Sequence, residues 1–209
     1  MRHLLLAGLL AAAPLVHAAE QTRTVPDFKT ITSKGAFKLI VDVGGKQSLT
    51  LKGDDEALAN VTTEVVGGEL VLTMKKDRER RGFSSDDGVR ITISVPQLKQ
   101  FQMEGAGMTE LNHLSGDRFE LVYRGAGMLT ATGSVDSFVL RAQGVGLLDA
   151  KNLAAKRADV VLEGVGSTSV RASETLNATV NGIGSLTYYG RPARVNKTVG
   201  GIGSVSAGD

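Results

Sequence analysis

The second half of the sequence repeats a glycine–aliphatic–glycine tripeptide six times at nearly constant spacing. The copies begin at residues 105, 125, 144, 164, 182 and 201, so successive copies lie 20, 19, 20, 18 and 19 residues apart. A fixed period of about 20 residues is typical of a solenoid, in which each repeat forms one coil that stacks on the previous coil. The six copies are Gly105-Ala106-Gly107, Gly125-Ala126-Gly127, Gly144-Val145-Gly146, Gly164-Val165-Gly166, Gly182-Ile183-Gly184 and Gly201-Ile202-Gly203.

Apolar residues alternate with polar residues on both sides of each tripeptide. Ahead of the second copy, Phe119, Leu121 and Tyr123 occupy every second position, and Leu129 and Ala131 do the same after it. A period of two residues indicates strands with one buried face. Strands of equal direction that stack about 4.8 Å apart form a parallel β-helix. We therefore predict an all-β fold with a parallel β-helix over residues 99–209.

The paired glycines are expected to form the bends between the sheets of each coil, because such bends need torsions or close chain approaches that a Cβ forbids. We predict that the aliphatic residue between them points inward and fills the corner. The next residue is Met108, Met128 or Leu147 in the first three copies and serine in the last three. If this column pointed outward it would form an apolar stripe suited to a partner, but we favour a place in the core.

Other meanings of a Gly-x-Gly repeat fit less well. A dinucleotide-binding loop needs a third glycine that opens a helix, and no copy supplies it. Calcium-binding nonapeptide repeats need an aspartate two residues after the tripeptide, where this sequence has Thr109, Leu129 and their equivalents. The tripeptides are therefore predicted to be structural.

Residues 19–98 contain strand-like segments without the regular repeat. We predict that this region forms a β layer that covers the first coil, since the end of a solenoid must be protected. A hairpin is expected from Val61–Val66 into Glu69–Met74 across Gly67-Gly68, and a short helical turn over residues 54–59.

The first 18 residues have the pattern of a cleavable signal peptide. A basic start at Arg2 precedes an apolar run from Leu4 to Val16, and Ala18 completes a small-residue cleavage site. The apolar run is shorter than the roughly 20 residues that a membrane-spanning helix needs. We predict cleavage after Ala18, no transmembrane span, and a periplasmic, secreted or cell-envelope location. The sequence has no cysteine, so it has none that could carry a lipoprotein anchor.

Composition argues against several classes of function. The absence of cysteine removes disulfides and cysteine-ligated zinc, and we predict neither a metal nor a cofactor. The formal net charge is only +2, and aromatic residues make up 4% with no tryptophan. Nucleic-acid binding depends on basic surfaces and stacking aromatics, so no nucleic-acid partner is predicted.

Residues 75–88 form a segment of mixed charge that is almost without apolar residues. By composition it resembles a solvated loop. The more specific hypothesis is a docking loop in which Arg78, Arg80 and Arg81 bind an acidic partner and Phe83 anchors it.

Few residues are suited to catalysis. His113 is the single histidine beyond the predicted signal peptide, and no nucleophile motif stands near it. Glu104 and Arg124 share one position on successive coils, so we expect a surface ion pair. A polysaccharide-acting enzyme would have to use outward carboxylates such as Glu104 or Asp149, but no column contains paired carboxylates.

With the coils aligned, the chain resembles the putative autotransporter adhesin head family, also called GIN-domain proteins. The resemblance runs from Phe28 to the end, through the early strands, the Val95-Pro96-x-Leu98 lead-in and the Gly-x-Gly corners. It implies a right-handed β-helix similar to pectin-lyase-type folds, exported from the cell and linked to adhesion. It implies no catalytic residues.

The sequence thus favours a non-enzymatic, exported envelope or surface protein that acts as an adhesin-like binding or structural module. A protein or glycan outside the cytoplasm is the expected partner, and self-association through a sheet edge or face is a further expectation. A β-helix lyase or hydrolase acting on polysaccharide is the alternative.

Overall fold

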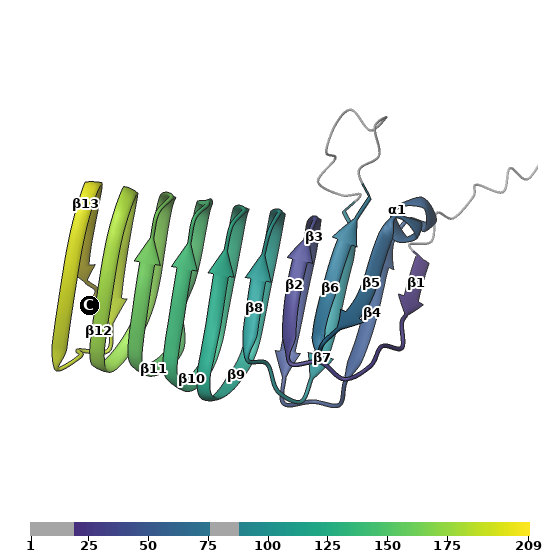
Figure 1. Cartoon of the computed structure of the whole chain (residues 1–209), viewed down its shortest axis with the longest axis horizontal. Helices are drawn as coiled ribbons and strands as arrows, with labels where there is room; N and C mark the ends of the chain where they lie inside the picture. The colour runs from purple at the N-terminus through teal and green to yellow at the C-terminus, as the bar shows by residue number, and fades with distance from the viewer. Residues whose placement is uncertain (1–18, 76–87) are drawn as a thin grey trace, which may run out of the picture.

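The computed structural model describes residues 19–75 and 88–209. It is nearly all β, with 77% of residues in strands and 3% in helix, and it forms a β-solenoid of about 5 turns (Figure 1). The predicted all-β solenoid is therefore confirmed. The elements are β1 Ala19–Thr22, β2 Thr30–Lys34, β3 Ala36–Val43, β4 Ser48–Gly53, α1 Asp55–Ala59, β5 Val61–Val66, β6 Glu69–Met74, β7 Arg90–Val95, β8 Gln100–Met103, β9 Ala106–Tyr123, β10 Ala126–Ala142, β11 Val145–Leu162, β12 Val165–Tyr189 and β13 Arg194–Ala207.

Each of the strands β9 to β12 runs through a whole coil, so neighbouring coils pair along almost their full length. The ladders from β9 through β13 are all parallel. Equivalent tripeptides lie opposite one another: Ala126 pairs with Ala106 on one side and with Val145 on the other. Residues that are equivalent in the sequence repeat therefore pair with one another in the sheet.

Parallel stacking continues into the first half of the chain, but not in sequence order. Strands β2 and β3, joined at Gly35, lie parallel to β8 and β9, and β6 and β7 lie parallel to β2 and β3 on the far side. Gly35-Ala36-Phe37 thus forms one more corner, with Ala36 opposite Ala106 and Phe37 in place of the second glycine. Sequence reasoning missed this corner because a lone glycine carries no repeat signal.

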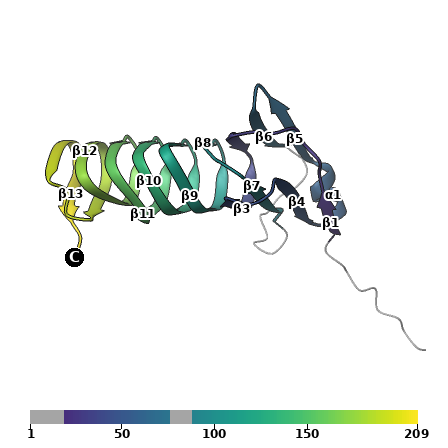
Figure 2. The same ribbon diagram turned by 90° about the horizontal axis from the view of Figure 1, so that it is seen from below.

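The N-terminal end of the solenoid has an antiparallel cover. Strand β1 pairs with β4, and β4 pairs with β7. The predicted hairpin joins β5 and β6, with Gly67 and Gly68 at positive φ in its turn. The predicted helical turn is α1, whose N-cap Asp54 accepts a hydrogen bond from the Ala57 N–H at 2.6 Å. Figure 2 shows the coils as a narrow column that widens where these segments join it.

The core is a set of inward columns that run along the solenoid axis. Phe119 and Phe138 sit opposite each other on β9 and β10, and their rings stack with centroids 6.2 Å apart. A second column runs in register from β6 to β12, and its buried members are Leu70, Ile31, Phe101, Leu121, Leu140, Val160 and Ala178. In β13 the position in register with Ala178 is Lys197, whose Nζ donates to the Val205 carbonyl at 3.4 Å.

Candidate functional site

The first five Gly-x-Gly corners, from Gly105 to Gly184, stack so closely on the preceding coil that neither glycine can carry a side chain. At Gly166, a Cβ would collide with the carbonyl oxygen of Gly146 in the preceding coil, and φ is +148°. At Gly164, where φ is not positive, a Cβ would collide with the Gly144 carbonyl oxygen in the same way. The inside of each corner is therefore filled by the backbone of the neighbouring coil.

This packing overturns the predicted inward orientation of the aliphatic middle residue. Val145 is 57% exposed, Ile183 56% and Ile202 76%, and Val165, Ala126 and Ala106 are exposed too. The physical reason is the tight corner: because backbone occupies its inner side, the side chain between the two glycines can only point to solvent.

The column after the second glycine also points outward, contrary to our preference for the core. Met108, Met128 and Leu147 are 41%, 39% and 48% exposed. The next residues, Leu129 and Leu148, are buried. The alternation keeps its phase across the corner, since the buried residues Tyr123 and Leu129 are six positions apart, and Ala126 and Met128 therefore fall on the outward face.

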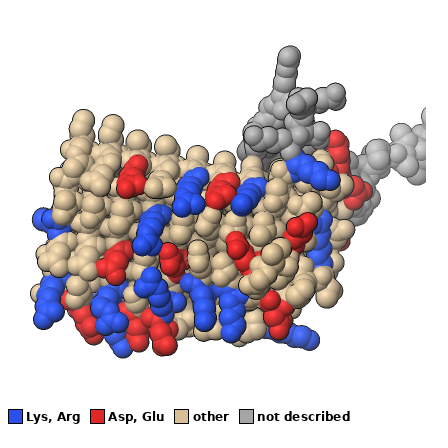
Figure 3. Space-filling model, viewed as in Figure 1, with Lys and Arg blue, Asp and Glu red and all other residues tan. Residues whose placement is uncertain are grey.

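Together the two columns form a continuous apolar surface along one edge of the solenoid, which we call the corner ridge. In Figure 3 the upper edge, where the corners lie, carries no charged side chain, and the charges begin below it. The corner ridge consists of Ala106, Ala126, Val145, Val165, Ile183 and Ile202 in the middle column and Met108, Met128 and Leu147 in the column that follows.

A row of polar side chains borders the corner ridge at the position before each first glycine. Glu104 bridges Lys34 at 3.4 Å and Arg124 at 3.6 Å, so the predicted Glu104–Arg124 ion pair is confirmed. Gln143 accepts from Arg124 and donates to Glu163 at 2.7 Å. The charges of this row alternate along the axis and therefore compensate one another.

The residues considered for catalysis do not come together. His113 is exposed, and its Nδ1 lies 3.6 Å from Asp42. Glu104 is held by two cations, and Asp149 pairs with Lys151 at 3.2 Å. Within residues 19–75 and 88–209, no three His, Cys, Asp or Glu side chains are grouped so that they could hold a metal ion. Arg78, Arg80, Arg81 and Phe83 lie outside the described residues, and their docking role stays a prediction.

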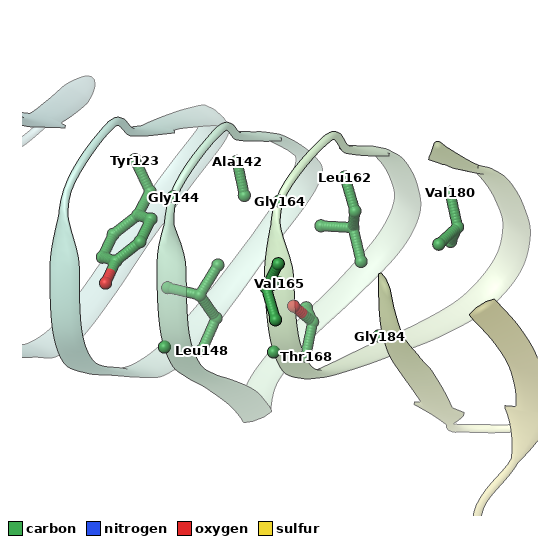
Figure 4. A pocket seen from close by; sticks show the side chains of 12 residues that line it. Tyr123, Ala142, Gly144, Leu148, Leu162, Gly164, Val165, Thr168, Val180 and Gly184 are labelled. Atoms are coloured by element: carbon green, nitrogen blue, oxygen red, sulfur yellow. The ribbon is translucent and has the colours of Figure 1, made fainter. Parts of the chain in front are cut away.

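One small cavity lies inside the column, next to the corners of the middle coils (Figure 4). Its volume is about 30 Å³, and mostly apolar side chains and corner glycines line it, with Thr168 among them. The buried Tyr123 hydroxyl lies 3.1 Å from the Val145 carbonyl and 3.3 Å from the Gly127 carbonyl, and it can donate to either. Such a volume holds water-sized molecules only, so the cavity is no site for an organic ligand.

Burial raises the pKa of Tyr123, which makes alkaline stability depend on this residue. The neutral phenol is favoured in the folded state. Its contribution is therefore complete below the unfolded pKa of about 10 and is lost as pH rises through the higher folded pKa. We expect Tyr123→Phe to lose about 1 kcal/mol at neutral pH through the missing hydrogen bond.

Above the unfolded tyrosine pKa, the stability of the wild type should fall more steeply with pH than that of Tyr123→Phe. Urea unfolding across alkaline pH measures the difference. Parallel curves for the two proteins would show that Tyr123 ionises in the fold as freely as in the unfolded chain.

No helix among the described residues is long and apolar enough to cross a membrane.

Comparison with known proteins agrees with this architecture. A putative adhesin from Bacteroides fragilis is similar in structure, with 24% identity, a TM-score of 0.75, and coverage of 93% of this chain and 98% of that one. A putative lipid binding protein from Parabacteroides distasonis is also similar, with 20% identity, a TM-score of 0.52, and coverage of 93% and 98%. At these identities the likeness concerns the fold.

No curated protein matches the sequence. The sequence profile of one family does match, over residues 27–192, and its description is "putative auto-transporter adhesin, head GIN domain". The match covers most of the chain and confirms the resemblance drawn from the corner repeat. The chain therefore belongs to the auto-transporter adhesin head GIN-domain family.

Proposed function

We propose that this protein is a non-catalytic, adhesin-like binding module that acts outside the cytoplasm, with the corner ridge as its contact surface. The observation that carries the proposal is that each of the six corners contributes at least one exposed Val, Leu, Ile or Met side chain to the same edge. A contiguous apolar patch on an otherwise polar protein is typical of an interaction surface. Export through the predicted signal peptide is part of the proposal.

The size of the ridge side chains makes the proposal energetically reasonable. Complete burial of a Val, Leu, Ile or Met side chain contributes about 1.5–3 kcal/mol. Six of the seven larger ridge side chains are already about half buried and Ile202 is 76% exposed, so each can add about 1 kcal/mol or more on contact. The coils hold these side chains in place before binding, which limits the entropy lost in the complex.

The family and the arrangement of ionisable groups support binding over catalysis. The family is described as adhesin-like. The carboxylates that a polysaccharide-acting enzyme would need are engaged in ion pairs along the faces. An exported protein of this kind is expected to act by contact with the surface of a cell or its surroundings.

A three-site ridge variant tests the proposed function. We expect Met108→Ser, Met128→Ser and Leu147→Ser together to reduce retention of the purified protein on bacterial envelope fragments by about tenfold or more. The later coils already carry Ser167, Ser185 and Ser204 in this column, so the fold should tolerate the change. Retention is measured by co-sedimentation.

The matched control is Val66→Ser, which removes an apolar side chain that is 66% exposed at the end of β5, beside the turn of the β5–β6 hairpin and away from the ridge. It should bind like the wild type. Wild-type protein that is not retained, or retention that is equal in the ridge variant and the control, would refute the role of the ridge.

A further inference from the structure

We propose that the corner ridge docks on a lipid surface of low net charge, with its side chains inserted into the interface of the bilayer. This inference rests on the proposed function and names the chemistry of the partner. The backbone, the shape and the charges of the ridge carry it.

The backbone at the corners is already hydrogen-bonded, as contact with an apolar medium requires. In five successive coils, the N–H of the middle residue donates to the carbonyl of Gly35 or of the first glycine in the preceding coil, at 2.9–3.1 Å. The donors are Ala106, Ala126, Val145, Val165 and Ile183. Polar backbone groups enter lipid only when they are paired within the protein. The ridge can therefore enter lipid without leaving these N–H groups unpaired.

The shape of the ridge fits a soft, flat partner better than a folded protein. The tripeptides pair in strict register, so the ridge side chains form a straight line on a convex edge. Five intervals of about 4.8 Å and a width of about 10 Å give a contact of roughly 250 Å². A stable protein interface needs about 800 Å² from each partner. Two ridges packed together would fall well short of this area, whereas a bilayer adapts to a narrow edge.

The charges beside the ridge point to a lipid surface without strong negative charge. On one side, the row of Lys34, Glu104, Arg124 and Glu163 has no net charge. On the other side stand Glu110 and Asp149, of which Asp149 pairs with Lys151. Attraction to anionic lipids depends on clustered Lys and Arg side chains. The ridge side chains include no Lys or Arg, and the two basic residues that continue the Met108 column, Lys38 and Arg90, lie beyond the end of the ridge, so binding should depend on apolar contact.

A single introduced tryptophan tests this inference, because the sequence contains none. The protein carries either Ile183→Trp on the ridge or Val66→Trp on the hairpin, and its fluorescence is followed as phosphatidylcholine vesicles are added. We expect a blue shift for Ile183→Trp and no shift for Val66→Trp. The shift should persist at high salt and should not grow when phosphatidylglycerol is mixed into the vesicles. Circular dichroism establishes that both variants are folded.

The outcomes separate the inference from the proposed function. A blue shift confined to Ile183→Trp supports a lipid-facing ridge. Absence of any shift, an equal shift in both variants, or a shift that needs phosphatidylglycerol and vanishes in salt overturns it. If the vesicles cause no blue shift, but the triple serine variant still loses retention on envelope fragments, the partner is a protein or glycan. In that case the ridge remains the contact surface.

Discussion

Replacement of Gly166 by alanine is expected to destabilise the protein by more than about 3 kcal/mol. Two costs combine at this position. The φ angle of +148° strains any residue with a Cβ, and that Cβ would also collide with the Gly146 carbonyl oxygen. The neighbouring coil cannot withdraw, because the two coils are paired on both sides of the corner, β10 with β11 before it and β11 with β12 after it. Urea unfolding measures the loss.

Two further glycines separate the strain from the collision. Gly44 has φ of +104°, and a Cβ added there would meet nothing within 4 Å, so Gly44→Ala should cost about 1–2 kcal/mol from strain alone. Gly164→Ala introduces the collision at an unstrained φ and should fall between the other two variants. If Gly166→Ala were no more costly than Gly44→Ala, the coils would not be packed backbone against backbone at the corners.

The second large effect is expected in the core. Phe138→Ala should cost about 3–5 kcal/mol, because Phe138 is fully buried and stacks on Phe119. The interior of a coil is narrow, and the paired strands on both sides prevent it from collapsing into the cavity. Phe138→Leu keeps most of the volume and should cost about 1.5 kcal/mol or less.

Thermal or urea unfolding of these two variants measures the difference, with Val66→Ala as a surface control that should change stability by less than about 0.5 kcal/mol. A loss for Phe138→Ala no larger than that of the surface control would place Phe138 outside the core.

Much of the fold could be predicted from the sequence because the coils of a solenoid have nearly equal lengths and similar patterns. The sequence therefore repeats with the period of the coils. Alternation placed Phe119, Leu121 and Tyr123 in the core, where the structure has them. The spacing of the tripeptides predicted that equivalent coils stack in register, as Ala126 and Val145 do. Both are local patterns that repeat, so the sequence alone displays them.

The orientation of the corner residues was predicted wrongly, although the period of two residues runs unbroken through the corner. Counted from Tyr123 to Leu129, it places Ala126 and Met128 on the outward face, where the structure has them. Only the three-dimensional structure shows that a Cβ added at a corner glycine would collide with the backbone of the preceding coil. The apolar character of these positions favoured the core, and the apolar residues turned out to mark the exposed ridge.

The stacking order of the first coils could not be predicted from the sequence. Consecutive strands usually lie side by side, but β6 and β7 stack outside β2 and β3 although they come later in the chain. The Gly35 corner has no glycine partner, since Phe37 takes the second position. Pairings between distant segments leave no local pattern that sequence reasoning could use.

The outward orientation of the corner ridge and its role as the contact surface can be tested with single introduced cysteines, because the sequence has no cysteine of its own. Val165→Cys on the ridge, Val160→Cys in the core and Val66→Cys on the hairpin are treated with a maleimide, first free and then bound to envelope fragments. We expect fast labelling at positions 165 and 66 and slow labelling at 160 in the free protein, with binding protecting position 165 alone. Slow labelling of free Val165→Cys would place the middle column inside the solenoid, and equal labelling in the free and bound states would show that the ridge is not the contact surface.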